Sequence, residues 1–299
     1  MQLLLVYMQI LQYHKTMEYM AHYEVSPSLH SQGLHAHDYY EFYLHINGGR
    51  QYCVDDYVFE LKQNQMIIIP PLHMHGLVCD RALVNYERCY LYLTPETLKN
   101  CGLNKIDLCK YFEDACNNKK FTQEISGEKT NFIIEIMKKI ERRKSYEKSE
   151  TDSFLFLEDY SMILNVLMIA QKISMKSPKL NNPSTNNTAI SKALHFINQH
   201  FTEELSIKEL SAKFNMSESS LSHEFKKYSK KSVYEYVLYK RVIKAKELLL
   251  TDSNLTQIAL DCGFNDYSNF LRVFKKFSGY SPREYKNHLL FLQQQRQPF

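Results

Sequence analysis

The stretch SNLTQIALDCGFNDYSNFLRVFKKFSGYS, residues 253–281, predicts a short helix, a tight turn and a second helix. Gly263 is the expected turn residue, because glycine readily adopts the left-handed conformation in which many helices end. Asp266 is the expected N-cap of the second helix, since its carboxylate can accept hydrogen bonds from the first backbone N–H groups. Two helices joined in this way form a helix-turn-helix, whose second helix can lie in the major groove of DNA.

A second stretch, LSIKELSAKFNMSESSLSHEFKKYSKKS, residues 205–232, has the same layout and also ends in a helix with Phe-Lys-Lys. Here Asn215 is expected to take the left-handed turn and Ser217 to cap the next helix. Between the two stretches, residues 232–250 have an apolar stripe at helical spacing and predict a connecting helix. Two units on one connecting helix suggest contact with successive major grooves, roughly 34 Å apart on one face of the duplex.

The segment from about residue 190 to 288 resembles the DNA-binding domain of the AraC/XylS family of bacterial transcription regulators. The resemblance is carried by KAKELL, IALDCGF, FLRVFKKFSG and SPREY, which follow one another within residues 241–286. It implies two helix-turn-helix units with double-stranded DNA as their partner. It also implies transcription regulation, favours activation over repression, and allows RNA polymerase as a further partner.

Helix geometry divides each second helix into a core side and a DNA side. Leu221 and Phe225 lie four residues apart, as do Phe270 and Phe274, and we expect both pairs in the core. The opposite sides then face DNA, where the family reads bases and where lysines at the helix ends meet phosphates. The predicted DNA-binding residues are Ser219, Ser222, His223, Lys226, Lys227, Ser268, Asn269, Arg272, Lys275 and Lys276.

Among these residues, Asn269 suits adenine and Arg272 suits guanine, because each can make a bidentate contact with the edge of that base. The alternative interpretation of the lysines is a solvated, charged helix end. The distribution of charge favours DNA: residues 188–299 hold 17 Lys and Arg against 11 Asp and Glu, whereas residues 1–187 hold 20 against 22. A basic C-terminal third favours a polyanion as its partner.

The stretch HAHDYYEFYLHING, residues 35–48, fits the first cupin motif, H-x-H-x3-E-x6-G. Interpreted as one β-strand, it places His35, His37 and Glu41 on one face, because successive strand side chains alternate. His75, in IPPLHMHG, is the best candidate in a second cupin motif that is only partly present. Residues 25–95 therefore resemble a small cupin-type β-barrel, the usual sensory domain of this family.

Three interpretations of these three histidines and the glutamate stay open. They can bind zinc, iron or manganese, since imidazoles and a carboxylate are adequate ligands. They can line a polar pocket for a small molecule, with tyrosine rings to stack on a sugar. They can also be structural residues of the barrel. The resemblance favours the pocket without a metal or other cofactor, and the predicted effector-pocket residues are His35, His37, Tyr39, Glu41, Tyr43 and His75.

Composition divides the chain into four parts. Residues 17–100 are rich in aromatic and β-branched runs of strand length. Residues 101–173 contain two apolar helical stretches that pack on the barrel, form a dimer interface, or do both. Residues 174–188, SMKSPKLNNPSTNNT, have the composition of a linker, and residues 189–290 form the DNA-binding domain. The predicted fold class is α+β: a cupin-like antiparallel β-barrel with a helical pair, then an all-α domain with two helix-turn-helix units.

The seven cysteines form no C-x-x-C pair, so zinc-ribbon spacing is absent and reduced thiols in a cytoplasmic protein are expected. Residues 1–16 are apolar, but they lack a basic n-region and a small-residue cleavage site, so neither a signal peptide nor a membrane span is expected.

The predicted function is a DNA-binding transcription regulator, active as a homodimer and controlled by a small-molecule effector, with carbohydrates as one candidate class. A DNA binder controlled by its own abundance or by a partner protein is the alternative. A metal-bound cupin enzyme is a rival, because two histidines and a carboxylate resemble the facial triad of non-haem iron enzymes. We do not expect an enzyme, since the last third of the chain has the pattern of a DNA reader.

Overall fold

A computed structural model describes residues 18–30, 33–49, 51–79, 82–103, 105–118, 120–143, 152–176, 189–251 and 254–294. Contacts within the chain divide it into an N-terminal unit, residues 1–31 and 35–184, and a C-terminal unit, residues 185–299 together with residues 32–34. Residues 1–17 and residues 177–188, which include most of the expected linker, lie outside the described residues. The remaining linker residues, 174–176, belong to a helix.

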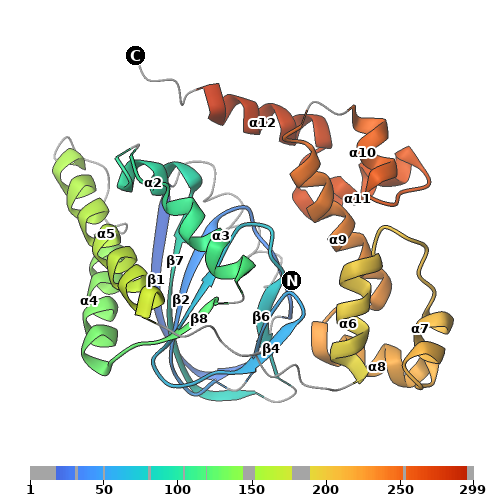
Figure 1. Ribbon diagram of the computed structural model, residues 1–299, viewed down its shortest axis with the longest axis horizontal. Helices are drawn as coiled ribbons and strands as arrows, with labels where there is room; N and C mark the ends of the chain where they lie inside the picture. The colour runs from blue at the N-terminus through green and yellow to red at the C-terminus, as the bar shows by residue number, and fades with distance from the viewer. Residues whose placement is uncertain are drawn as a thin grey trace. The chain divides into compact units, whose positions relative to one another are not determined.

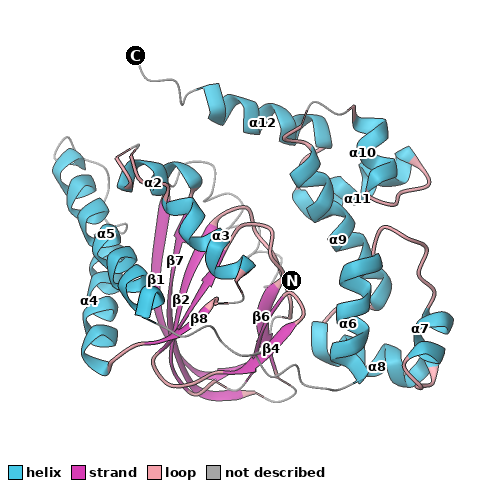
Figure 2. Cartoon of the chain, in the orientation of Figure 1, coloured by secondary structure: helices cyan, strands magenta, loops and turns pink. Residues whose placement is uncertain are grey.

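Two antiparallel sheets form the β-structure of the N-terminal unit (Figure 2). The larger sheet has the strand order β1-β7-β2-β5-β8, formed by Tyr19–Leu29, Leu83–Leu93, Tyr40–Asn47, Gln65–Ile69 and Thr122–Glu124. The smaller sheet has the order β4-β3-β6, formed by Tyr57–Glu60, Gln51–Val54 and His75–Val78. The prediction of an antiparallel β-domain in this part of the chain is confirmed.

The side chains of β2 alternate between two apolar cores. Phe42 and Leu44 belong to a cluster shared with helices. Tyr43, on the opposite face of the strand, belongs to a cluster that also contains Tyr52 of β3. Because this second cluster takes residues from both sheets, the sheets pack face to face, and Glu41, two residues from Tyr43, points between them.

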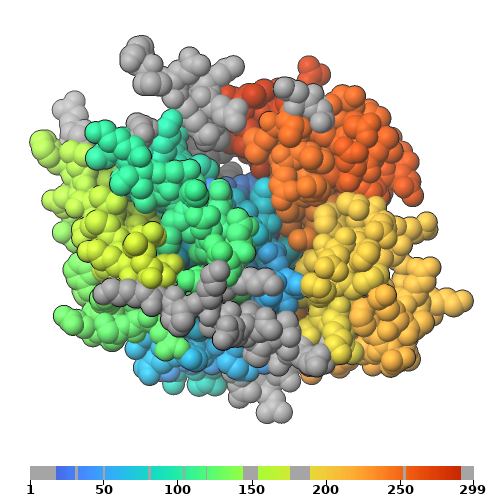
Figure 3. All heavy atoms as spheres, in the orientation of Figure 1, coloured from blue at the N-terminus to red at the C-terminus, as the bar shows by residue number. Residues whose placement is uncertain are grey.

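In the described part of this unit, the sheets are accompanied by α2 (Pro95–Cys101), α3 (Leu108–Asn117), α4 (Gly127–Arg143) and α5 (Asp152–Lys176). Figure 3 shows α3 and α5 at the surface of this unit. Residues 154–175 of α5 are long and apolar enough to cross a membrane by length and composition. However, Ile163 and Val166 are fully buried in the same cluster as Met137 of α4, so α5 packs on a protein core.

The described residues of the C-terminal unit form helices joined by short connections (Figure 1). The short helices α7 and α10 each contact the longer helix that follows, α8 and α11 respectively. A further helix, α9, joins the two pairs. The helices are α6 (Ala189–His200), α7 (Ile207–Lys213), α8 (Glu218–Ser229), α9 (Val233–Leu248), α10 (Leu255–Asp261), α11 (Tyr267–Ser278) and α12 (Pro282–Gln294).

The turns within both pairs have the conformations expected from the sequence. Asn215 has φ 53° and Gly263 has φ 84°, both in the left-handed region. Ser217 accepts a hydrogen bond from a backbone N–H of α8, and Asp266 accepts two from α11. Glycine is required at 263 for a second reason, since a Cβ there would lie 2.2 Å from the carbonyl oxygen of Thr202.

Helices α8 and α11 also end alike, which extends the similarity of the two pairs beyond Phe-Lys-Lys. The Ser229 hydroxyl lies 2.9 Å from the carbonyl oxygen of Phe225, and the Ser278 hydroxyl lies 2.7 Å from that of Phe274. In each case the serine hydroxyl also accepts a hydrogen bond from the N–H two residues later. A serine four residues after the core phenylalanine therefore ends both helices.

Candidate functional site

The segment before β2 brings two histidines to the edge of β6. His35 pairs with His75 in an isolated antiparallel bridge, in which each N–H donates to the other's carbonyl at 2.9 and 2.8 Å. His37 lies two residues further along this segment. The prediction that His35, His37 and Glu41 lie on one strand was wrong, because β2 begins only at Tyr40 and both histidines precede it.

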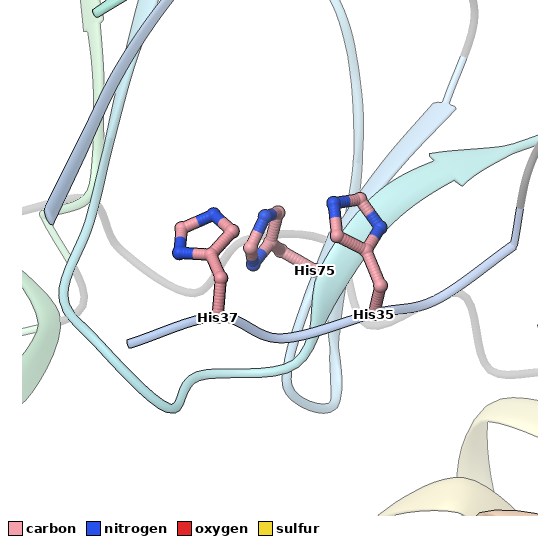
Figure 4. A group of neighbouring side chains, drawn as sticks. All are labelled: His35, His37 and His75. Carbon is pink, nitrogen blue, oxygen red and sulfur yellow. The ribbon is translucent and has the colours of Figure 1, made fainter. Parts of the chain in front are cut away.

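The side chains nevertheless converge, as Figure 4 shows for the three histidines. The ligand nitrogens of His35, His37 and His75 all lie within 4.8 Å of one another. Glu41 adds a carboxylate, whose Oε2 is 2.9 Å from Nε2 of His37 and 3.0 Å from Nε2 of His75. The side chains of His37, Glu41 and His75 are only 9%, 4% and 1% exposed, so this cluster is shielded from water.

Backbone carbonyls fix the position of one proton on two of the imidazoles. Nδ1 of His37 lies 3.0 Å from the carbonyl oxygen of Tyr39, and Nδ1 of His75 lies 2.8 Å from that of His73. Because a carbonyl only accepts, each Nδ1 carries a proton, and Nε2 of the neutral ring carries a lone pair. Histidines that bind metals are commonly held in this way.

The point at which the two Nε2 atoms meet Glu41 is rich in electrons. Burial lowers the pKa of His37, although its hydrogen bond with Glu41 acts in the opposite direction. Burial also acts to raise the pKa of Glu41, but its contacts with His37 and His75 outweigh this and hold the pKa well below its usual range. The Glu41 carboxylate and two imidazole nitrogens thus surround one point, where a proton held in the hydrogen bond, a hydrogen-bond donor of a ligand or a divalent cation can lie.

Tyrosines surround this cluster, but not all of those expected. The ring of Tyr39 stacks on His37 with centroids 3.7 Å apart, and Tyr92 of β7 lies 4.3 Å from Tyr39. The hydroxyl of Tyr43, which lies on the same face of β2 as Glu41, pairs with that of Tyr86. Two further tyrosines near the cluster were not predicted: Tyr92, and Tyr52, whose ring stacks near that of His75 with centroids 6.5 Å apart.

The C-terminal unit presents the predicted DNA-binding residues on the sides of α8 and α11 that face away from its core. Leu221, Phe225, Phe270 and Phe274 are fully buried, as expected. On α11, Nη2 of Arg272 donates to Oδ1 of Asn269 at 2.9 Å. Asn269 is half-buried, and the exposed members are Ser219, Ser222, His223, Lys226, Lys227, Ser268, Arg272, Lys275 and Lys276.

Both units match known families. Residues 19–126 match the AraC-like ligand binding domain, and residues 210–288 match a helix-turn-helix domain. The fold and these matches define a two-domain protein in which a ligand-binding β-domain precedes a helix-turn-helix domain. The chain belongs to the AraC/XylS family of transcription regulators.

Individual relatives match only part of the chain. The chain is 25% identical over 137 residues to the HTH-type transcriptional activator RhaS of Klebsiella pneumoniae (strain 342). This alignment covers 46% of this chain and 48% of that protein. It is 36% identical over 72 residues to RhaS of Enterobacter sp. (strain 638), covering 24% and 26%. The matched part therefore spans about half the length of these curated relatives, or less.

Among solved structures, the C-terminal domain of the two-component response regulator yesN from Fusobacterium nucleatum is 33% identical to this chain. The alignment has a TM-score of 0.32 and covers 33% of this chain and 97% of that domain.

A further histidine on the inner face of β2 is His45, which is buried and stacks on Tyr86 with centroids 5.4 Å apart. Its Nδ1 has no hydrogen-bond partner among the described residues. Burial lowers the pKa of His45 to about 4. The folded protein therefore holds His45 neutral at a pH at which the unfolded chain binds a proton.

We expect this difference to make the free energy of unfolding fall as the pH falls from about 6.5 to about 4. The sign follows because the unfolded chain binds more protons than the folded protein in this range, and the loss is at most about 3 kcal/mol. His45→Phe retains a ring against Tyr86 and should remove this part of the pH dependence. Urea denaturation of both proteins at pH 7, 5.5 and 4.5 measures the effect, and equal pH dependence in the two would contradict the assignment.

Proposed function

We propose that this chain is a transcription regulator that binds specific DNA sequences under the control of a small-molecule effector. The observation that carries the proposal is the combination of a shielded, electron-rich cluster in a ligand-binding domain with two exposed polar helix faces in a helix-turn-helix domain. Neither domain alone requires this function. Together they supply an input and an output, and we assign no catalytic role to the cluster.

Each helix pair acts as a helix-turn-helix whose second helix, α8 or α11, enters a major groove. Arg272 and Asn269 are held together by their hydrogen bond, so they can present donors and an acceptor to neighbouring bases as one unit. Lys226 and Lys275 lie in the last turns of these helices, where a cation also offsets the helix dipole. Their exposure leaves them able to reach phosphates, which supports a positioning role.

Two substitutions distinguish base reading from phosphate contact. Arg272→Ala should weaken binding to the specific site by about 1–3 kcal/mol and relax the preference at one base pair. Lys276→Ala should weaken binding to all sequences and reduce the slope of log K against log salt by about 1. The measurement is a gel-shift salt series on a site selected from random DNA, with the exposed Lys172→Ala in α5 as control. Identical salt slopes and unchanged base preference in the first two variants would refute these roles.

The effector site is proposed at His35, His37, Glu41 and His75. Hydroxyl groups of a carbohydrate can donate to the Glu41 carboxylate, while Tyr39 offers a ring for the apolar face of a sugar. Control of DNA binding requires the effector to bind one arrangement of the protein more tightly than another. A carbohydrate is therefore the first class of molecule to test.

A thermal-shift screen of sugars and other metabolites on the full chain identifies the effector, and footprinting then measures its effect on DNA binding. The double substitution His37→Ala with Glu41→Ala should abolish the effector response and leave DNA binding without effector unchanged. His30→Ala, an exposed histidine of the same unit, is the control and should respond normally. If the double variant still responds to the effector, the effector binds elsewhere. If no effector changes the DNA binding of the wild-type protein, control by abundance or by a partner protein is favoured.

We also propose that the protein is a cytoplasmic homodimer, able to contact RNA polymerase at the promoter. Phe154 and Leu157 of α5 are 79% and 63% exposed and lie one helical turn apart, and a second copy of the chain would shield them. The double substitution Phe154→Lys with Leu157→Lys should convert dimer to monomer in sedimentation velocity, whereas Gln171→Lys on the same helix should not. A wild-type monomer at micromolar concentration would rule out this interface.

A further inference from the structure

A second cluster of metal-ligating side chains lies beside the first, and neither the predicted sites nor the proposed function uses it. It consists of Asp55, His73 and Cys116, whose ligand atoms all lie within 4.8 Å of one another. The three residues come from separate parts of the N-terminal unit. Asp55 lies in the turn between β3 and β4, His73 lies between β5 and β6, and Cys116 lies in the last turn of α3.

All the contacts within this cluster converge on one atom. Nδ1 of His73 is 2.6 Å from Oδ2 of Asp55 and 3.4 Å from Sγ of Cys116. A carboxylate oxygen and a sulfur atom therefore face the same imidazole nitrogen, so one cation placed among them could contact all three side chains.

The backbone holds Asp55 in place for this contact. Its N–H donates to the carbonyl of Met74 at 2.5 Å, and the N–H of Met74 donates to Oδ1 of Asp55 at 3.0 Å. One carboxylate oxygen is therefore anchored and the other is presented to His73. The side chains of His73 and Asp55 are 34% and 23% exposed, so an ion can reach the cluster from solvent.

Thiolate, imidazole and carboxylate together form a ligand set that suits zinc, which takes three protein ligands and water in an open tetrahedral site. With Zn–S of about 2.3 Å and Zn–N of about 2.0 Å, sulfur and nitrogen ligands lie roughly 3.5 Å apart. The Sγ–Nδ1 distance of 3.4 Å already meets this requirement. The contact between Asp55 and His73 must lengthen by less than about 1 Å to admit the ion.

We propose that Asp55, His73 and Cys116 form a zinc site with water in the fourth position. Binding replaces the proton shared at Nδ1 and the thiol proton of Cys116, both of which pass to solvent, and involves no oxidation or reduction. The proposed zinc site and the effector cluster have no ligand in common, but they are linked through the backbone. The carbonyl of His73 holds Nδ1 of His75, so zinc at His73 would fix the segment that carries the effector-site histidine.

The test uses the full chain, reduced and stripped of metal, with Co²⁺ as a spectroscopic probe and Zn²⁺ as competitor. We expect one equivalent of Co²⁺ to give the near-ultraviolet absorption of a cobalt–thiolate bond, and Zn²⁺ to abolish it. Cys116→Ser should remove this absorption, and Asp55→Asn should weaken Co²⁺ binding at least tenfold. Asparagine retains an acceptor for Met74 and tolerates the left-handed φ of 53° at this position, so this variant should still fold.

Two control variants separate this site from other thiols and from the effector cluster. Cys109→Ser removes another half-buried thiol from α3 and should leave the absorption unchanged. The double variant His37→Ala with Glu41→Ala should also retain it. Three outcomes would each overturn the proposal. Wild-type protein could show no cobalt–thiolate absorption, the absorption could persist in Cys116→Ser, or it could be lost in the effector-cluster variant. None of these outcomes bears on DNA binding, so the proposed function is tested separately.

Discussion

The paired backbone hydrogen bonds between His35 and His75 are the constraint on which the sensory domain depends. They join two segments 40 residues apart in the sequence and place the imidazoles of His35, His37 and His75 on one side of the chain. Each segment then supplies its own orienting acceptor, since the carbonyl of Tyr39 holds Nδ1 of His37 and the carbonyl of His73 holds Nδ1 of His75. The orientation of both Nε2 atoms toward Glu41 is therefore a consequence of backbone geometry.

The C-terminal unit could be predicted from sequence because its signals are local. A left-handed Asn215 or Gly263, a serine or aspartate N-cap and two pairs of apolar residues at four-residue spacing each act within one or two helical turns. The capping serines Ser229 and Ser278 are equally local and were visible as FKKYSK and FKKFSG. The sequence prediction covered only the core phenylalanines and the charged lysines of these stretches, not the serines that follow them.

The proximity of the three histidines and Glu41 was predicted from the sequence, but their geometry was not. The motif spacing selected His35, His37, Glu41 and His75 correctly as neighbours, although two of them lie outside the strand that was expected to align them. Tyr92 and Cys116 could not be found in this way, because strand pairing and helix packing bring them in from distant parts of the chain. Local patterns indicate which side chains are chemically suited, whereas non-local pairing decides which of them meet.

Each cluster takes one histidine from the three-residue segment 73–75, and this proximity has a thermodynamic consequence. Met74 is bonded to Asp55 of one cluster, and it lies between His73 of that cluster and His75 of the other. If occupation of one cluster changes the position of this segment, it changes the affinity of the other by a definite factor, and the reverse effect must have the same magnitude. A segment fixed by a metal loses less conformational freedom when an effector binds, so the expected sign of the coupling is positive.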